Sequence, residues 1–421
     1  MKTTEWKDTE IGRIPKDWEV KPIGEIFTFK NGLNKGKEFF GEGTPIINYT
    51  DVYHKRSLVA KDIKGKVTLS SDEIKRFEVK KGDMFFTRTS ETPEEVGIAS
   101  VLLEDIPSCV FSGFVLRARP INDSLFPDYC GYGFSTKQIR KDIVNNCTFT
   151  TRALTNGQVL SSIKIPLLPI SEQQRIANAL SDIDMLITSL DKAIEKKRMV
   201  KQGAMQQLLT GKKRLKGFTE GWKIKRIGDI GYTYNGLTGK SKGDFGVGTA
   251  HYVTFLNILN NPIIDTALLE KVNVALNEKQ NEVRKGDLFF NTSSETPEEV
   301  GICATIDVDI DELYLNSFCF GFRLTDRDIL SDYLAYYFRS SIGRQMMTML
   351  AQGATRYNLS KDNFLKCRLL LPGSLVEQQA IIDVLSIMDG EISSITHERE
   401  KYLRLKEGMM QELLTGKTRL I

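Results

Sequence analysis

Two short polar segments carry the side chains best suited to chemistry, and they stand at matching places in a sequence that repeats itself. The first segment reads Thr87, Arg88, Thr89 and Ser90, and the second reads Asn291, Thr292, Ser293 and Ser294. Hydroxyl, amide and guanidinium groups that leave a strand can donate to phosphate oxygens, and arginine and asparagine can also read guanine and adenine edges. The tetrapeptides differ while their flanks match, as expected of segments that read different bases. The alternative interpretation is a solvated turn.

Basic residues supply further candidates for contact with a polyanion. Arg152 follows Thr151 in the first half, and Arg356 is followed by Tyr357 and Asn358 in the second. Two glycine-flanked loops add Lys35 and Lys37, and Lys240 and Lys242. Arginine suits phosphate or guanine, and loop lysines suit the nucleic-acid backbone. Exposed loop lysines are common, so these loops are the weaker candidates.

The elements that must position these residues occur twice, about 205 residues apart. WEVKPIGEI from Trp18 returns as WKIKRIGDI from Trp222, and KGDMFF at Lys81–Phe86 returns as KGDLFF at Lys285–Phe290. The octapeptide SETPEEVG returns unchanged, and LLTGK closes both copies. Solenoid repeats are much shorter, so this pattern indicates a duplicated domain followed by a helix. The identical, acidic octapeptide is expected to shape a loop through its proline and not to read bases.

Short β-type runs broken by Gly, Asn, Asp and Pro fill the first ~165 residues of each copy. They are TPIINYTDVY, GDMFFTRTS and FSGFVLRARP in copy one, and AHYVTFLNI, GDLFFNTSS and SFCFGFRLT in copy two. Helical patches follow near Tyr129–Val144 and Tyr333–Leu350. Each copy is therefore expected to fold as a mixed α/β domain with a strongly bent sheet.

A long heptad pattern follows each domain. Ser171 is placed to cap the first helix, with Gln174 at the capping-box spacing, and Gly211 and Gly416 stand where the helices should stop. The expected seam consists of Ile176, Leu180, Ile183, Ile187 and Leu190 in one helix, and Ile381, Leu385, Met388, Ile392 and Ile395 in the other. Helices of about 40 residues are ~60 Å long and must bury such a stripe. The expected partner is the other helix; the alternative is that each helix packs on its own domain.

Lys201 and Lys406 occupy matching seam positions, where they could fix the register or extend to solvent. The expected boundaries are residues 1–170 for a first recognition domain, 171–211 for a spacer helix, 212–375 for a second domain and 376–421 for a second helix and tail. The predicted fold class is therefore two mixed α/β recognition domains related by pseudo-twofold symmetry and joined by two long antiparallel coiled-coil helices. DNA has approximate twofold symmetry in its backbone, and a ~60 Å rod spans about 17 base pairs. Two half-sites of different sequence with unread bases between them are expected.

This layout resembles the specificity subunit of type I restriction–modification enzymes. The residues that carry the resemblance are the tryptophan followed by IGEI or IGDI, the KGD-FF strand, the Thr-Arg segment, LLP-x-SEQQRIA and LLTGK-x-RL. Copy two departs in LPGSLVEQQAIID, a looser version of the helix start. The resemblance implies partners: double-stranded DNA, two methyltransferase (modification) subunits, and restriction subunits in a full complex. It also implies that S-adenosylmethionine, ATP and Mg²⁺ belong to those partners, and that this subunit has no catalytic residues or cofactor of its own.

Other features of the sequence fit this interpretation. The net charge of +4 permits nucleic-acid binding without demonstrating it, and 41% apolar residues suit a globular chain. Six scattered cysteines and three histidines show no zinc-ligand spacing, so no metal site is expected. No membrane span or signal peptide is apparent, which favours the cytoplasm. Residues 191–216, rich in Lys and Arg, could form a solvated face, contact the DNA backbone across the unread spacer or dock the methyltransferase. Candidate capping or partner residues are Glu172, Gln173, Arg175, Glu377 and Gln378.

Two other functions compete with DNA recognition as interpretations of the sequence. A self-sufficient nuclease or methyltransferase should show catalytic motifs, yet there is no Asn/Asp-Pro-Pro-aromatic loop, and GLTGKS has Tyr234 where a phosphate-binding loop requires glycine. A coiled-coil adaptor that does not bind nucleic acid is the second rival, and a lack of sequence preference in DNA binding would identify it.

Overall fold

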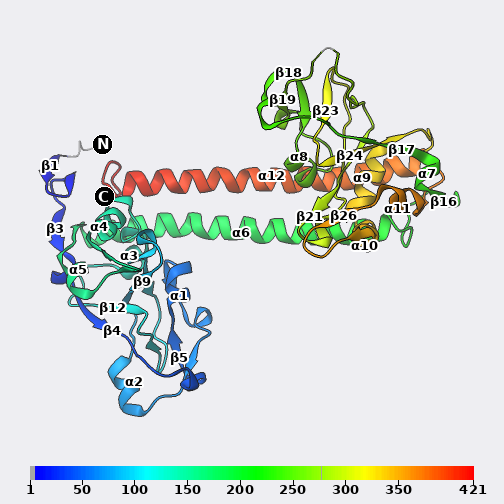
Figure 1. Cartoon of the computed structure of the whole chain (residues 1–421). Coiled ribbons are helices and arrows are strands. Elements are labelled where there is room, and N and C mark those ends of the chain that lie inside the picture. The colour runs from blue at the N-terminus through cyan, green and yellow to red at the C-terminus, as the bar shows by residue number, and fades with distance from the viewer. Residues whose placement is uncertain (1–4, 276) are drawn as a thin grey trace. The chain divides into compact units, whose positions relative to one another are not determined.

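The computed structural model describes residues 5–275 and 277–421 and divides into two compact units. Unit 1 holds the chain up to Ser189 together with Glu398–Ile421, and unit 2 holds Leu190–His397. Both boundaries fall inside long helices, α6 (Ile170–Leu208) and α12 (Leu375–Leu413), which Figure 1 labels. Each unit therefore combines a globular domain with part of both helices.

The largest sheet of unit 1 has five strands. In order across the sheet they are β4 (Phe27–Asn31), β12 (Val115–Pro120), β8 (Met84–Thr87), β10 (Ala99–Leu102) and β6 (Ser57–Leu58). A three-stranded sheet consists of β11 (Val110–Phe111), β5 (Phe40–Ile47) and β7 (Lys66–Val67), and another of β13 (Thr148–Phe149), β14 (Ala153–Leu154) and β9 (Thr89–Ser90). Two antiparallel pairs complete the strands: β1 (Trp6–Thr9) with β2 (Gly12–Pro15), and β15 (Lys164–Leu167) with β3 (Glu19–Pro22).

Unit 2 repeats this arrangement with one strand fewer in its main sheet. That sheet runs β17 (Gly231–Asn235), β24 (Cys319–Leu324), β20 (Leu288–Asn291) and β22 (Cys303–Thr305). The two smaller sheets are β19 (Glu270–Val272), β18 (Phe245–Val253) and β23 (Leu313–Leu315), and β21 (Ser293–Ser294), β26 (Tyr357–Leu359) and β25 (Ala351–Gln352). β16 (Lys223–Arg226) pairs with β27 (Arg368–Leu371). The expected mixed α/β domain is confirmed in both copies.

The KGD-FF strand lies at the centre of each unit because successive side chains of a strand point to opposite faces. In β8, Met84 and Phe86 join the core beneath the helices, while Phe85 joins a second cluster on the other face. In β20, Leu288 and Phe290 likewise belong to one core cluster, and Phe289 belongs to another. A strand buried on both faces explains the continuous apolar run in the sequence.

Short helices complete the domains. Unit 1 has α1 (Tyr49–His54), α2 (Ser71–Phe77), α3 (Pro127–Gly133), α4 (Lys137–Asn146) and α5 (Gly157–Ser162). Unit 2 has α7 (Ile227–Ile230), α8 (Phe255–Asn260), α9 (Ser331–Arg339), α10 (Ser341–Leu350) and α11 (Lys361–Lys366). The two predicted helical patches are confirmed, and each is split in two by a new N-cap, Thr136 or Ser340.

One local prediction is wrong in both copies. TPIINYTDVY and AHYVTFLNI were expected to be strands throughout, but their second halves form α1 and α8. Asn48 and Asp51 close a capping box at the start of α1, and the Thr254 hydroxyl accepts from the Asn257 backbone at the start of α8. These caps satisfy the free amides of a first helical turn, which favours helix over the β propensity of the segment.

The long helices pair with each other, antiparallel, within each unit. In unit 1, Ile176 and Leu180 of α6 share a core cluster with Leu413 of α12, and the Lys406 ammonium forms an ion pair with Asp184. In unit 2, Leu208 of α6 shares a cluster with Ile381 and Leu385 of α12, and Lys201 pairs with Asp389. In both units, residue numbers rise along one helix as they fall along the other. The alternative, with each helix packed only on its own domain, is wrong.

The predicted seam lies on the covered side of the helices. Ile176, Leu180, Ile187, Ile381 and Leu385 are buried, and Ile183, Leu190, Met388, Ile392 and Ile395 are half-buried. The matching lysines form ion pairs at the seam, which supports the register-fixing interpretation over extension to solvent.

The helix ends differ slightly from the prediction. α6 begins at Ile170, so Ser171 lies inside the first turn and is not the cap; the Pro169 carbonyl accepts from the amides of Glu172 and Gln173. The helices end at Leu208 and Leu413, three residues before glycines with φ of 70° and 72°. Gly211 and Gly416 therefore terminate the helices in the left-handed conformation, as predicted. Across the described residues, no helix combines the length and apolarity needed to cross a bilayer.

Candidate nucleic-acid interface

A buried aspartate and a left-handed glycine set the position of the strand that leads into each candidate segment. Gly82 and Gly286 have φ of 87° and 83°, which favours glycine. Asp83 accepts two hydrogen bonds from the Arg119 guanidinium, at 2.8 and 2.7 Å. Asp287 does the same with Arg323, and this bond raises the pKa of Arg323 above its ordinary value. The repeated KGD motif thus anchors β8 and β20.

Thr87 and Asn291, the first residues of the two candidate tetrapeptides, are interior residues. Both are completely buried. The Thr87 hydroxyl donates to the Glu95 carbonyl (2.8 Å) and accepts from the Ile98 amide (2.9 Å). The Asn291 amide donates to the Glu299 carbonyl (2.8 Å), and its carbonyl accepts from the Ile302 amide. Their prediction as DNA contacts is wrong in this structure, because their polar atoms are already satisfied inside the fold.

Sheet pairing brings two separately predicted candidates together. In unit 1, Thr89 and Ser90 pair with Leu154 and Ala153, so the Thr151–Arg152 turn lies at the end of the adjoining hairpin. In unit 2, Ser293 and Ser294 pair with Asn358 and Tyr357, next to Arg356. Arg152, Arg356 and Asn358 are exposed, while Arg88, Thr89, Thr292, Ser293, Ser294 and Tyr357 are half-buried and Ser90 is buried.

The unchanged octapeptide shapes a loop through its proline, as predicted, and this loop supports the hairpin. Its proline opens a short 3-10 turn at Pro93–Glu95 and Pro297–Glu299. The Ser90 hydroxyl donates to the Glu95 carboxylate, and the Ser294 hydroxyl donates to Glu299 at 2.9 Å. These bonds account for the serine and glutamate that both copies share, and they occupy Ser90 in a scaffold role. Thr89 and Ser293 are thereby presented on strands of fixed position.

A third segment meets the candidate segments in each unit. We call residues 112–114 and 316–318, which connect β11 to β12 and β23 to β24, the tip loops. The Arg88 amide donates to the Phe114 carbonyl (3.1 Å), and the Thr292 amide donates to the Phe318 carbonyl (3.0 Å). On the other side, a Cβ on Gly32 would lie 2.1 Å from the Ser112 carbonyl oxygen, and one on Gly236 would lie 2.1 Å from that of Asn316. The repeated Asn-Gly dipeptide therefore permits close packing against the tip loop.

Two of the four predicted basic-loop lysines are held by the protein. The Lys35 ammonium forms an ion pair with Glu73 (2.7 Å) and lies over the Phe39 ring. The Lys240 side chain is only 5% exposed and contacts Glu278 and the Asn273 carbonyl, so its prediction as a free backbone contact is wrong. Lys37 and Lys242 are exposed. Lys35 and Lys240 are thus engaged in ion pairs within the protein and are not free to contact a ligand.

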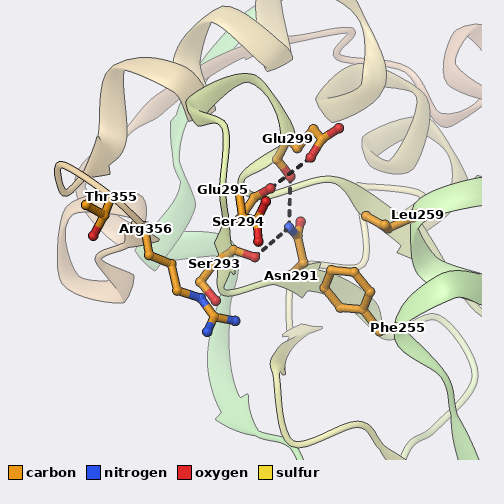
Figure 2. A pocket seen from close by; sticks show the side chains of 9 residues that line it. All are labelled: Phe255, Leu259, Asn291, Ser293, Ser294, Glu295, Glu299, Thr355 and Arg356. Carbon is orange, nitrogen blue, oxygen red and sulfur yellow. Dashed lines mark hydrogen bonds between the residues drawn. The ribbon is translucent and has the colours of Figure 1, made fainter. Parts of the chain in front are cut away.

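Unit 2 has a cavity of about 470 Å³ beside its candidate segments. It is lined by Phe255, Leu259, Asn291, Ser293, Ser294, Glu295, Glu299, Thr355 and Arg356. Figure 2 shows Phe255 and Leu259 on one side and Arg356 and Thr355 on the other. An apolar wall faces a cation here, with hydroxyl groups and the carboxylates of Glu295 and Glu299 between them.

The matching place in unit 1 has a different chemistry. Tyr53 of α1 stands where α8 has Leu259, and its hydroxyl donates to Glu95 at 2.8 Å. Tyr53 also stacks on Tyr49, with ring centroids 5.7 Å apart. Hydrogen bonds from Ser90 and Tyr53 hold the pKa of Glu95 below its usual value, and Glu95 raises the pKa of Tyr53. Sequence comparison of the two copies at this helix could have located the difference.

The candidate glutamates and glutamines at the helix starts are buried and make contacts inside their own units, so their prediction as partner-docking residues is wrong. Glu172 accepts from the Trp18 indole (3.0 Å) and from Arg419 (2.7 Å), and Glu377 accepts from Arg214 at 2.8 and 2.7 Å. Gln173 and Gln378 bond to backbone groups of their own units. Arg175, by contrast, is exposed. In each unit, the glutamate of the EQQ motif thus accepts hydrogen bonds from the repeated tryptophan and from the arginine of LLTGK-x-RL.

Comparison with known proteins decides the family. The family model described as the type I restriction modification DNA specificity domain matches the chain twice, over residues 15–197 and 219–404. The chain belongs to this family. The two matches correspond to the two copies of the repeat, as a specificity subunit with two recognition domains requires.

Relatives of this specificity subunit span its whole length. It is 27% identical over 450 residues to the putative type I restriction enzyme MjaX specificity subunit of Methanocaldococcus jannaschii, covering 100% of this chain and 98% of that subunit. Two solved structures share the fold. The type I restriction-modification S subunit from M. genitalium has a TM-score of 0.55 at 15% identity, covering 94% of this chain and 96% of the other. A chain from a study of complex assembly in the type I R-M system has a TM-score of 0.61 at 13% identity, covering 96% and 99%.

Proposed function

We propose that this specificity subunit reads a two-part DNA sequence, with unit 1 reading one half-site and unit 2 reading the other. The observation that best supports this proposal comes from the matched hairpins: their scaffold residues make the same contacts in both units, whereas their exposed residues differ. Asp83 and Asp287, and the two octapeptides, make the same contacts in both units. The exposed or half-buried positions around them differ, as Thr89 and Ser293 do. One scaffold carrying two different readers suits an asymmetric site.

Each proposed contact is assigned to a part of the DNA that suits the chemistry of its side chain. Arg152 and Arg356, on exposed hairpin turns, contact phosphate or guanine, and Thr89, Ser293 and Asn358 donate to phosphates or base edges. Lys37 and Lys242 contact the DNA backbone. The interior residues Thr87 and Asn291 are left out because their polar atoms are occupied.

The chemistry on DNA would be supplied by partners. We propose that the chain is non-catalytic and binds two methyltransferase subunits, which carry S-adenosylmethionine, and that restriction subunits with ATP and Mg²⁺ join the full complex. α6 and α12 set the gap between half-sites and provide docking surface for the methyltransferase. The family match supports this arrangement.

Methylation mapping of host DNA tests the proposal. We expect a split motif with a fixed gap, lost when the gene for this chain is deleted. Arg152→Ala and Arg356→Ala are a matched pair, and each should relax or abolish one half-site only. Loss of specificity at both half-sites from either variant would contradict the assignment of one half-site to each unit.

The rival of a self-sufficient enzyme is tested separately. Purified chain, incubated with DNA, Mg²⁺ and the cofactors but without partner subunits, should neither cleave nor methylate. Activity under these conditions would favour the rival. Sequence-independent binding in the presence of the methyltransferase would favour the adaptor.

A further inference from the structure

Each unit exposes a phenylalanine at the same point of its fold. Phe114 directly precedes β12 and is 65% exposed, and Phe318 directly precedes β24 and is 61% exposed. Burying such a side chain contributes about 1.5–3 kcal/mol, so folding alone gives no reason to leave it in water. The same exposure in both copies indicates that the ring has a use outside the fold.

The backbone under each ring is held in a fixed turn. In unit 1 the amides of Phe114 and Val115 donate to the Ser112 hydroxyl (3.3 Å) and carbonyl (3.1 Å). In unit 2 the amides of Phe318 and Cys319 donate to the Asn316 side-chain oxygen (2.8 Å) and carbonyl (3.1 Å). Different side chains, serine and asparagine, make the same turn. The ring therefore projects from a rigid support, which lowers the entropy cost of using it for binding.

The phenylalanines lie among the candidate DNA-contacting segments. The Phe114 carbonyl accepts from the Arg88 amide, and the Arg88 carbonyl accepts from Thr155, just beyond the Arg152 hairpin. In unit 2 the Phe318 carbonyl accepts from Thr292, whose carbonyl accepts from Leu359 of the strand after Arg356. The Lys361 ammonium donates to Asn235 of the Asn-Gly turn that packs on the same tip loop. In both units, the backbone of the exposed phenylalanine is thus hydrogen-bonded to a candidate DNA-contacting segment.

We propose that Phe114 and Phe318 are apolar wedges that enter partly between neighbouring base pairs of the bound duplex, one wedge in each half-site. Arg152 and Arg356 on the adjoining hairpins neutralise phosphates, and each ring stacks on the base face that is exposed when the duplex kinks. The position of the rings argues for DNA over a protein surface, because each tip loop is hydrogen-bonded to a candidate DNA-contacting segment, Arg88 in unit 1 and Thr292 in unit 2. This inference rests on the proposed function, since it names a contact within the DNA interface.

The test uses the assembled methyltransferase, with this chain and two modification subunits, on duplexes carrying the mapped site. 2-Aminopurine replaces one adenine at a time in each half-site, away from the adenines that are methylated. We expect its fluorescence to rise on binding at one position per half-site. Phe114→Ala should remove the rise in one half-site and weaken binding on the order of tenfold, and Phe318→Ala should do so in the other. Phe114→Trp should retain the rise.

Ile121→Ala is the matched control, because Ile121 is 54% exposed and follows the opposite end of the same strand β12. It should leave both signals unchanged. The alanine variants should assemble with normal stoichiometry and unchanged melting temperature, since the rings are exposed. Unchanged DNA binding with impaired assembly would overturn the proposal in favour of a partner-docking role. No fluorescence rise at any position, with normal affinity of both variants, would also overturn it.

A negative result for the wedges can be distinguished from a negative result for the proposed function. If the rings are not wedges, methylation mapping still yields a two-part motif that depends on this chain. If the chain is not a specificity subunit, no such motif appears, and the fluorescence experiment has no site to use.

Discussion

At the scale of single residues, burial distinguishes a residue that supports the fold from one that is available to read DNA. Thr87 and Asn291 differ in type yet make the same two contacts, one with a glutamate carbonyl and one with a backbone amide eleven residues on. A difference between the copies is therefore not sufficient to identify a reading residue. Burial and hydrogen bonds within the fold show which residues are not available to read DNA.

Asn291 offers a direct test of this distinction. Asn291→Ala should lower the free energy of unfolding by about 1–3 kcal/mol, because it leaves a buried carbonyl and a buried amide unpaired. Asn291→Thr, which installs the residue found in copy one, should restore most of that loss. Both variants should methylate the same motif as the parent. Denaturant unfolding and methylation mapping measure the two effects, and a changed half-site with unchanged stability would show that Asn291 reads DNA after all.

The cysteines give a second prediction at this scale. Burial raises the pKa of the Cys109 and Cys130 thiols to about 12 and raises the pKa of Cys303 and Cys319 as well. The thiolate is the reactive form, so these four should resist alkylation at pH 8 in the folded protein. Cys147, half-buried, should react first. Mass spectrometry after iodoacetamide treatment, with a denatured sample as the control, would contradict this if Cys303 reacted as fast as Cys147.

At the scale of elements, matching ion clusters join both long helices to each globular domain. In unit 1 Asp184 of α6 accepts from the Tyr132 hydroxyl (2.8 Å) and pairs with Lys406 of α12. In unit 2 Asp389 of α12 accepts from Tyr336 (2.9 Å) and pairs with Lys201 of α6. Burial lowers the pKa of Lys406, and the hydrogen bond with Asp184 opposes that shift. The cluster fixes the helix register beneath each domain.

Removing one charge of this cluster should be costly. We expect Lys406→Ala to destabilise the protein by about 1–2 kcal/mol, less than a fully buried pair because the Asp184 side chain is 36% exposed. The exchange Lys406→Asp with Asp184→Lys should recover part of the loss. Urea unfolding of the two single variants and the double variant gives the coupling directly. A coupling of zero would show that packing alone sets the register.

The sequence predicted the elements with a strong period and missed those fixed by distant contacts. The heptad seam predicted both long helices and their pairing, because Ile176, Leu180 and their counterparts repeat over many turns. α1 and α8 were missed since a cap at Asn48 or Thr254 overrides β propensity in six residues. In the candidate site, the hairpin neighbours were predicted separately, and the tip-loop phenylalanines were not predicted. Pairing across more than 60 residues, as between Thr89 and Leu154, leaves no periodic signal.

At the scale of the whole molecule, the long helices belong to both units. Residues up to Ser189 of α6 lie in unit 1 and those from Leu190 in unit 2, and α12 divides at His397. Because the helices pair within each unit, a change in the length of one must be matched in the other. Lengthening both at the unit boundaries leaves the contacts described inside each unit intact. The recognition domains and the helix length can thus be varied independently.

Four residues inserted into both helices, after Ser189 and after His397, would add about 6 Å to each. We expect the methylated motif to keep both half-sites and to gain a longer gap, because the reading residues are untouched. Seven residues should lengthen the gap further while preserving the heptad seam, and insertion into one helix alone should impair folding by breaking the register. Methylation mapping measures the gap, and thermal unfolding monitors the fold. Altered half-sites, or an unchanged gap in a folded double insertion, would show that the helices do not set the distance.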